Sequence, residues 1–390
     1  MTSPSVPMVE SLAAELADLQ AHGLLRSRVH LDGPQAARVS IEGRTYLSFA
    51  SNDYLGLASD PRLIEAVKDA AVSFGVGAGA SHLLYGHSAA HDALEQDLAR
   101  FVGFPDALLF STGYMANLGV VTALCGRDDE IFADRLNHAS LNDAMVLSRA
   151  KFRRYAHCDV DALERALRAS KARRKLVVTD AVFSMDGDIA PLVALLGACE
   201  RHDAYLLVDD AHGFGVLGPH GEGTLAELGI DSCRVIYMGT LGKAAGVYGA
   251  FVAGSGVLID YLVNRARTYI YTTATPPILA AVLRESLNIL RTEDWRRERL
   301  AELVIAFRQA LERHAPKLIE SRTAIQPLVL GEANQAVAVS RALKARGFVV
   351  PAVRPPTVPA GTARLRISLS AAHCVDDVRA LARALHEVLE

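Results

Sequence analysis

Short, unbroken apolar runs alternate with stretches of helical periodicity through the middle of the chain. The apolar runs lie at 107–110, 130–133, 175–182, 204–209, 234–239 and 248–254, and helical stretches at 114–125, 159–169 and 191–202 separate several of them. Strands that are buried on both faces read as continuous hydrophobic runs, and intervening helices are typical of parallel connections. The pattern predicts an α/β fold with a mostly parallel sheet, in which ligands gather at the carboxyl ends of the strands.

The two ends of the chain have a different pattern. Residues 9–22 have the spacing of an amphipathic helix, and Asp60-Pro61 has the cap and first-turn proline of a second helix. Two long helical stretches (277–291 and 294–314) precede strands near 324–330, 348–353 and 363–369 and a closing helix over 375–389. We therefore expect an N-terminal helix and segment at 1–50, a large domain at 51–290 and a smaller α+β domain at 291–390.

Composition and charge exclude several classes of protein. The chain has 390 residues, of which 51% are hydrophobic and 22% charged, so it can bury a large core and is not disordered. The net charge is −3, which does not favour nucleic acid or an anionic membrane as a partner. The five cysteines form no CxxC pair, and residues 1–8 lack the basic start and apolar run of a signal peptide, so we expect none. We expect a cytoplasmic protein without a membrane span.

A first candidate site follows the apolar run at 205–208, where Asp209-Asp210-Ala211-His212-Gly213 ends the predicted strand. A carboxylate at the end of a buried strand is costly unless it meets a cation or hydrogen-bond donors. A solvated loop is an equally good interpretation of this pair alone. Magnesium binding would need a phosphate loop of the form GxxxxGK[ST], and Gly242-Lys243 is followed by Ala244.

A second candidate site is the lysine in Gly239-Thr240-Leu241-Gly242-Lys243-Ala244-Ala245-Gly246. Small neighbours allow a ligand to approach the backbone, and loss of hydration lowers the pKa of a lysine and makes it nucleophilic. A surface lysine in a turn is the commoner fate of an isolated GK pair. A strand-end Asp with a nearby His, followed by a Lys in a Gly-rich loop, suits pyridoxal phosphate (PLP): the lysine forms the Schiff base and the carboxylate holds the pyridine nitrogen protonated.

Six segments together resemble one family. They are Ser51–Leu57 (SNDYLGL), Thr112–Asn117 (TGYMAN), Asn137–Ser140 (NHAS), Phe183–Gly187 (FSMDG), Asp209–Gly213 (DDAHG) and Thr240–Lys243 (TLGK). In this order they resemble the motifs of the α-oxoamine synthases, which are fold-type I PLP-dependent transferases with an aspartate aminotransferase-like fold. The resemblance runs from about residue 10 to the C-terminus. It implies a large domain with a mostly parallel sheet, a smaller C-terminal domain and PLP as the cofactor.

The resemblance also implies roles for individual residues. Lys243 would carry the cofactor and move the substrate's Cα proton, Asp209 would pair with the pyridine nitrogen, and His138 would stack on the ring. The remaining cofactor contacts would be Ser184, His212 and Thr240, the helix start at Gly113 and Tyr114, and Thr272 or Thr273 from the other subunit of a homodimer with shared active sites. Arg354 would bind the substrate carboxylate, with Thr357 beside it and Arg26 near the acyl site. No metal is expected, because His87 and His91 lack the Glu of an HExxH motif.

The stretch from Arg354 to Arg366 (RPPTVPAGTARLR) discriminates among substrates within the family. It resembles members that join L-alanine to a pimeloyl thioester, carried by coenzyme A or by a carrier protein, in biotin synthesis. An alternative is a glycine C-acetyltransferase, which joins glycine to acetyl-CoA. A non-enzymatic aminotransferase-like domain is a further alternative, against which intact Lys243, Asp209 and His138 argue. An NTPase is excluded by the missing phosphate loop.

Overall fold

A computed structural model describes residues 7–390 of the chain, and these residues divide into two compact units. The larger unit comprises Asn52–Ser184 and Asp188–Leu300. The smaller unit comprises the described residues up to Ser51, the short segment Met185–Gly187 and Ala301–Glu390. The boundary between Leu300 and Ala301 falls within helix α12 (Trp295–Ala310).

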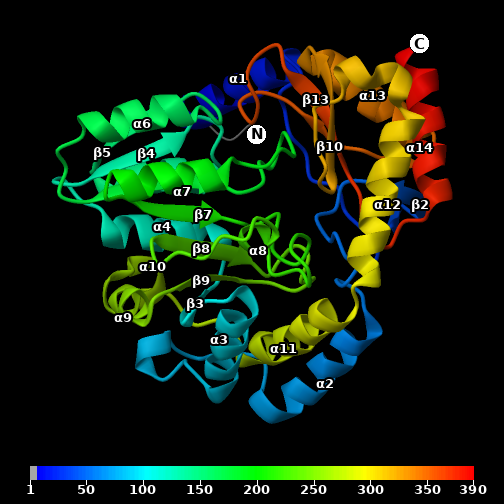
Figure 1. Cartoon of the computed structure of the whole chain (residues 1–390). Helices are drawn as coiled ribbons and strands as arrows, with labels where there is room; N and C mark the ends of the chain where they lie inside the picture. Colours follow the sequence, from blue (N-terminus) through cyan, green and yellow to red (C-terminus); the bar gives the residue numbers. More distant parts are fainter. Residues whose placement is uncertain (1–6) are drawn as a thin grey trace. The chain divides into compact units, whose positions relative to one another are not determined.

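The larger unit alternates strands and helices along the chain (Figure 1). Its strands are β3 (Asp106–Phe110), β4 (Glu130–Asp134), β5 (Lys151–Tyr155), β6 (Lys175–Asp180), β7 (Tyr205–Asp209), β8 (Val235–Thr240) and β9 (Ala250–Gly254). Its helices are α2 (Pro61–Phe74), the 3-10 helix η1 (His82–Leu84), α3 (Ala89–Val102), α4 (Gly113–Leu124), α5 (Ala139–Ser148), α6 (Val160–Ala169), α7 (Leu192–Arg201), α8 (Thr224–Glu227), α9 (Gly256–Arg265), α10 (Arg267–Ile270) and α11 (Pro277–Thr292).

The seven strands form one sheet in the order β3-β9-β8-β7-β6-β4-β5. Strands β8, β7, β6, β4 and β5 pair in parallel, whereas β9 is antiparallel to both of its neighbours, β3 and β8. All strands except β9 therefore end at one edge of the sheet. The register pairs Asp180 directly with Asp209, so two carboxyl side chains meet at that edge.

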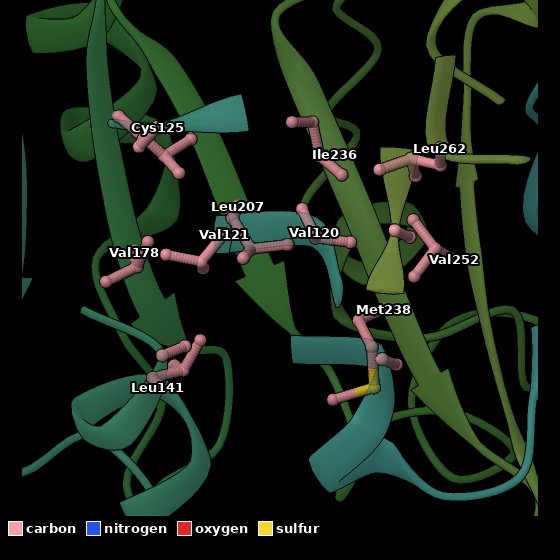
Figure 2. Packing of buried hydrophobic residues seen from close by; sticks show 14 of the residues in the cluster. Val120, Val121, Cys125, Leu141, Val178, Leu207, Ile236, Met238, Val252 and Leu262 are labelled. Carbon is pink, nitrogen blue, oxygen red and sulfur yellow. The ribbon is translucent and has the colours of Figure 1, made fainter. Parts of the chain in front are cut away.

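Both faces of this sheet are buried, which explains the unbroken apolar runs. Alternate residues of a strand point to opposite faces. On one face, sheet residues such as Val178, Leu207 and Ile236 pack against Val120 and Val121 of α4, as Figure 2 shows. The strand neighbours of these residues, such as Val177 and Leu206, point to the other face and are also fully buried. Helices α6 and α7 pack on strands of this sheet.

The smaller unit contains two three-stranded sheets, in the orders β1-β2-β11 and β10-β13-β12. Its elements are α1 (Pro7–Ala21), β1 (Arg38–Ile41), β2 (Arg44–Ser48), η2 (Glu312–Lys317), β10 (Ile325–Gly331), α13 (Ala333–Ala345), β11 (Phe348–Val349), β12 (Ala352–Val353), β13 (Ala363–Ser368) and α14 (Val375–Leu389). β11 runs parallel to β2, so one sheet combines strands from the N-terminal and the C-terminal parts of the smaller unit. None of the side chains of α1 is buried, and its apolar stripe at Val9, Leu12, Leu16 and Leu19 is exposed.

The predicted apolar runs all coincide with strands, and the α/β class is confirmed. Two expectations differ in detail from the structure. The expected strand at 348–353 is two strands in different sheets, because Val350-Pro351 separates β11 from β12 and a proline cannot donate to a ladder. The expected helix at 294–314 ends at Ala310 and is followed by the 3-10 helix η2.

Candidate active site

Lys243 lies in the loop that follows β8, at the edge where the parallel strands end. Its Nζ atom is 3.0 Å from Nε2 of His212. The loop is held by Gly246, which has a φ of 70°; a Cβ there would lie 2.6 Å from the Cβ of Leu57 and 2.7 Å from the backbone of Ala58. Only glycine fits this close approach, so Gly246 helps to fix the position of the loop.

His212 connects the lysine to the segment that precedes α2. Its Nδ1 atom is 2.6 Å from the hydroxyl of Tyr54, and that hydroxyl is 3.1 Å from Oδ1 of Asn52. A protonated Lys243 donates to Nε2, so Nδ1–H donates to Tyr54 and the Tyr54 hydroxyl donates to Asn52. The buried imidazole is thus oriented from both sides, and it holds the lysine nitrogen in place.

The two strand-end carboxylates, Asp209 and Asp210, have different surroundings. Asp210 is fully buried and accepts hydrogen bonds from the backbone and hydroxyl of Thr224 and from the hydroxyl of Tyr237. Burial raises the pKa of Asp210 to about 7, although these donors act against the shift. Asp209 accepts from the Ala211 backbone (3.1 Å) and from the side-chain amide of Asn117 (2.7 Å). Asp210 therefore serves the fold, and Asp209 faces the groups around Lys243.

His138 stands at the start of α5, and hydrogen bonds through Ser140 and Asn117 link it to Asp209. Its backbone N–H donates to Asp180 (2.7 Å), and its Nδ1 is 2.7 Å from the hydroxyl of Ser140. The Ser140 hydroxyl is 2.9 Å from the side-chain amide of Asn117, which also contacts Asp209. Loss of hydration lowers the pKa of His138, while the charge of Asp209 acts in the opposite direction. Burial raises the pKa of Asp180 well above its usual range, and the charge of Asp209 adds to this effect.

An anion-binding position lies at the N-terminus of α4. The helix begins at Gly113, and the hydroxyl of its cap, Thr112, accepts from the backbone N–H of Met115. The first turn of a twelve-residue helix presents backbone N–H groups and a positive dipole end, which suit a phosphate. The hydroxyl of Tyr114 donates to the Asp143 carboxylate. Thr240, at the end of β8, donates its hydroxyl to the carbonyl of Gly249 (3.1 Å).

Ser184 lies in the segment that follows β6, and an ion pair holds this segment. His157 bridges Asp134 at the end of β4 (3.0 Å) and Asp188 (2.8 Å). Burial by itself would lower the pKa of His157, but the hydrogen bonds to Asp134 and Asp188 raise it to about 12. The imidazolium therefore remains charged at neutral pH and ties the segment beside Ser184 to the sheet.

This bridge predicts a pH-dependent contribution to stability. The pKa of His157 is higher in the folded state than the usual value of about 6.5, so the contribution is complete below pH 6.5 and decreases as the pH rises toward 12. We expect His157→Gln to lower the free energy of unfolding by about 2 kcal/mol near pH 6 and by less at pH 10. Urea unfolding of the wild type and the variant between pH 6 and pH 10 measures this effect. A difference in the free energy of unfolding that stays constant with pH would contradict a charged His157 bridge.

Thr272 and Thr273 lie in the segment between α10 and α11. Thr273 is exposed, and the backbone N–H of Ala274 next to it donates to the carbonyl of Ala80. Their expected role, as a contact from the other subunit, stays a prediction.

The three residues expected at the substrate come together within the smaller unit. Arg26 donates from Nη2 to the hydroxyl of Thr357 (3.0 Å), and Arg354 donates from Nη2 to the carbonyl of Leu25 (2.7 Å). Nε of Arg354 is buried without a partner among the described residues. Burial lowers the pKa of Arg354, and the positive charge of Arg26 adds to the effect. Two cations side by side, one with an unused donor, make a favourable place for a carboxylate.

The histidines that lack an HExxH motif form a hydrogen-bonded group of their own. Nδ1 of His82 is 2.8 Å from Nδ1 of His87, and His91 contacts Ser88 through Nδ1 and the carbonyl of Thr275 through Nε2. Both nitrogens of His91 thus already have protein partners. The expectation that the protein uses no metal stays a prediction.

The residues of the larger unit fit PLP. Lys243 would supply the amine for a Schiff base, Asp209 would supply a buried acceptor for the pyridine nitrogen, and the first turn of α4 would bind the phosphate. His138 is linked to Asp209 through Ser140 and Asn117, and His212 is linked to Lys243, so the residues form two hydrogen-bonded groups. The two groups are close enough for the charges of Asp209 and Lys243 both to act on His138. Acceptor, amine and anion site are the three features that this cofactor requires of a protein.

Three residues that bond to the predicted site residues were not themselves predicted: Asn117, Tyr54 and Asp180. Asn117 and Tyr54 stand within recognised motifs, and a polar residue on the otherwise apolar helix 114–125 was a usable signal for Asn117. Asp180 ends an apolar run just as Asp209 does, and that pattern could have identified it.

Known proteins resemble the chain over nearly its whole length. The profile of the family "Aminotransferase class I and II" matches residues 44–385. The 8-amino-7-oxononanoate synthase of Methylobacillus flagellatus is 58% identical over 386 residues, covering 99% of this chain and 98% of the relative. That of Nitrosospira multiformis is 58% identical over 379 residues, covering 97% and 96%.

Solved structures agree with the sequence relatives. A serine palmitoyltransferase variant from S. paucimobilis with a bound PLP–myriocin aldimine has a TM-score of 0.92 at 32% identity, covering 98% of each chain. The 8-amino-7-oxononanoate synthase of Francisella tularensis has a TM-score of 0.77 at 32% identity, covering 88% of this chain and 98% of the other. The fold is therefore that of the fold-type I PLP enzymes, and the cofactor is PLP.

Among residues 7–390, no helix combines the length and the apolar run that crossing a membrane requires. The strand order, the lysine and carboxylate at the strand ends, and the matches over nearly the full length all agree. The chain belongs to the class I and II aminotransferase family and, within it, to the 8-amino-7-oxononanoate synthases.

Proposed function

We propose that this protein condenses L-alanine with a pimeloyl thioester and releases CO2 and the free thiol, giving 8-amino-7-oxononanoate for biotin synthesis. The observation that carries the proposal is the Lys243–His212 pair, with its 3.0 Å contact, in a chain that is 58% identical to synthases of that name. The charges of Lys243 and Asp209 both act on His138, which supports one site. The acyl carrier is either coenzyme A or a carrier protein.

Bound PLP supplies an electron sink that stabilises negative charge at the substrate's Cα. Lys243 is proposed to hold the cofactor covalently and afterwards to accept and return the Cα proton at Nζ. Asp209 would stabilise a positive charge on the pyridine nitrogen, and this would make the bound ring a better acceptor of electrons. His212 and Tyr54 keep Nζ of Lys243 in position. Ser184, Thr240, Gly113 and Tyr114 are proposed as further cofactor contacts.

Product identification tests the reaction. Purified protein with PLP is offered L-alanine, glycine and L-serine, each with pimeloyl-CoA, a pimeloyl carrier protein and acetyl-CoA, and products are identified by mass spectrometry. We expect 8-amino-7-oxononanoate from alanine and a pimeloyl thioester. Each buried methylene contributes about 0.8 kcal/mol, so an enclosed acyl chain favours pimeloyl over acetyl by several orders of magnitude. A preference for glycine with acetyl-CoA would instead identify a glycine C-acetyltransferase.

Arg354 is proposed to bind the carboxylate of the amino acid, with Thr357 and Arg26 beside it. Its buried and unpartnered Nε supports this role. Because a charge-assisted hydrogen bond contributes about 1.5–3 kcal/mol, we expect Arg354→Ala to raise the KM for alanine roughly 10- to 100-fold. Arg354→Lys should recover only part of the loss, since an ammonium cannot replace the planar fork. Steady-state kinetics with alanine varied check this; an unchanged KM in both variants would remove Arg354 from the site.

We further propose a homodimer in which Thr272 or Thr273 reaches the cofactor phosphate of the other subunit. Exposed apolar side chains nearby, among them Leu84, Tyr85 and Tyr271, support a partner surface in this region. Subunits carrying Lys243→Ala are mixed with differently tagged subunits carrying both Thr272→Ala and Thr273→Ala. Hybrid dimers should regain up to one intact site, and doubly tagged dimers without activity would contradict shared sites. A cytoplasmic location stays part of the proposal and is tested by cell fractionation.

A further inference from the structure

Asn117 occupies an unusual position for an amide. It is fully buried on α4, one turn after Gly113, among residues that are otherwise apolar. Its Nδ2 donates to Oδ2 of Asp209 (2.7 Å) and to Oγ of Ser140 (2.9 Å), which uses both of its hydrogens. Its own Oδ1 is buried without a hydrogen-bond partner among the described residues. Leaving a buried acceptor unpaired is costly, so the donor half of this amide is the part that the site requires.

Ser140 passes the donor role from Asn117 on to His138. A hydroxyl has one hydrogen, and because Oγ of Ser140 accepts from Asn117, it can give that hydrogen to Nδ1 of His138, 2.7 Å away. The backbone N–H of Ser140 also points to this nitrogen, at 3.3 Å. An imidazole nitrogen that receives two donors carries no hydrogen of its own. His138 is therefore a neutral imidazole with its proton on Nε2.

The same amide acts on the carboxylate at its other end. Asp209 receives hydrogen bonds from Asn117 and from the Ala211 backbone, so both oxygens act as acceptors, which favours the ionised form. The neighbouring carboxyl, Asp180, accepts from the backbone of His138 instead. The donors are thus distributed so that the negative charge belongs to Asp209.

We propose that Asn117 is a positioning residue that sets the protonation of two groups at once: it keeps Asp209 an ionised acceptor and, through Ser140, keeps the proton of neutral His138 on Nε2. His138 then takes part as a hydrogen-bond donor and not as a base, so the Cα proton is left to Lys243. The protonation pattern follows from the contacts above, and only its meaning for catalysis rests on the proposed function.

Nitrogen-15 NMR of histidine-labelled protein measures the pattern directly, in cofactor-free protein and in protein loaded with PLP. His138→Gln assigns the His138 signals. In the wild type we expect Nδ1 without hydrogen and Nε2 with hydrogen; a proton on Nδ1 of His138 would overturn the proposal without any variant.

Asn117→Asp is the sharpest variant, because it keeps the shape and leaves one hydrogen where the amide has two. The new carboxyl is buried beside Asp209, so it stays protonated and gives its hydrogen to Asp209, and its other oxygen is an acceptor. The hydroxyl of Ser140 should turn toward residue 117. Nδ1 of His138 then keeps only the 3.3 Å bond from the Ser140 backbone, so its NMR signal should shift and show a proton on Nδ1 in part of the molecules. Asn264→Asp is the control: this amide on α9 donates to the carbonyl of Asp260, on a different helix from Asn117 and His138, so the His138 signals should stay as in the wild type. Unchanged His138 signals in Asn117→Asp would overturn the proposal.

The affinity for PLP separates the two effects of the Asn117 amide, one on Asp209 and the other on His138 through Ser140. Asn117→Ala should raise the dissociation constant of PLP about 10- to 100-fold, as expected for the loss of a charge-assisted hydrogen bond at Asp209. Ser140→Ala keeps the Asn117–Asp209 bond, so its affinity for PLP should stay within about twofold of the wild type while the His138 signals change. Equal affinities in all of these proteins would overturn the proposed effect on Asp209. None of these measurements needs turnover, whereas product identification tests the function separately.

Discussion

Replacing Lys243 with alanine is expected to abolish turnover, with a loss of about 10⁴-fold or more, because the variant lacks the amine that we propose for both the covalent attachment and the proton transfer. Borohydride treatment of the wild type with PLP should fix the cofactor to the peptide that contains Lys243, and the variant should show no such bond. Mass spectrometry of protease digests measures both results.

Lys175→Ala is the matched control. This lysine lies at the start of β6, and its Nζ donates to the carbonyl of His202, away from the strand ends. The control should keep both the reducible bond and turnover. Normal turnover in Lys243→Ala would show that the cofactor assignment is wrong for this residue.

Asp209→Asn should lower turnover by roughly 10³-fold and weaken PLP binding, because a neutral amide no longer stabilises the pyridinium. Spectrophotometric titration with PLP and initial rates check the two effects. Asp210→Asn is the neighbouring control: Asp210 bonds to Thr224 and Tyr237, so its replacement should lower the free energy of unfolding by about 1–3 kcal/mol and leave PLP affinity near the wild type. If instead the Asp210 variant loses the cofactor and the Asp209 variant keeps it, the two roles are exchanged.

The fold was predictable where burial alone decides the pattern. The strands from 107 to 254 are apolar because helices cover both faces of the sheet, and each of the six runs was visible. β5, with the sequence KFRRY, was missed because it is the edge strand and its first four side chains are exposed. Charged side chains protect such an edge from pairing with other chains, and they hide the strand from a search for apolar runs.

The site was predictable as far as it depends on single residues with rare chemistry. Lys243 and Asp209 stand out because a lysine or a carboxylate at the end of a buried strand needs a reason. Asn117, Tyr54 and Asp180 acquire their roles only from partners far along the chain: Asn117 meets Asp209 across 92 positions, and Tyr54 meets His212 across 158. Such pairs depend on strand order and register, which local patterns do not encode.

The reversed direction of β9 provides a practical attachment point. Its last residue, Gly254, lies at the edge opposite to the one where β7 and β8 deliver Asp209 and Thr240, and α9 begins just beyond it. The side chain of Val257 there is 82% exposed. Once the exposed Cys233 and Cys374 are replaced by serine, a cysteine introduced by Val257→Cys would carry a fluorophore or a surface tether. Immobilised in this way, the protein would present the catalytic edge of its sheet to the solution.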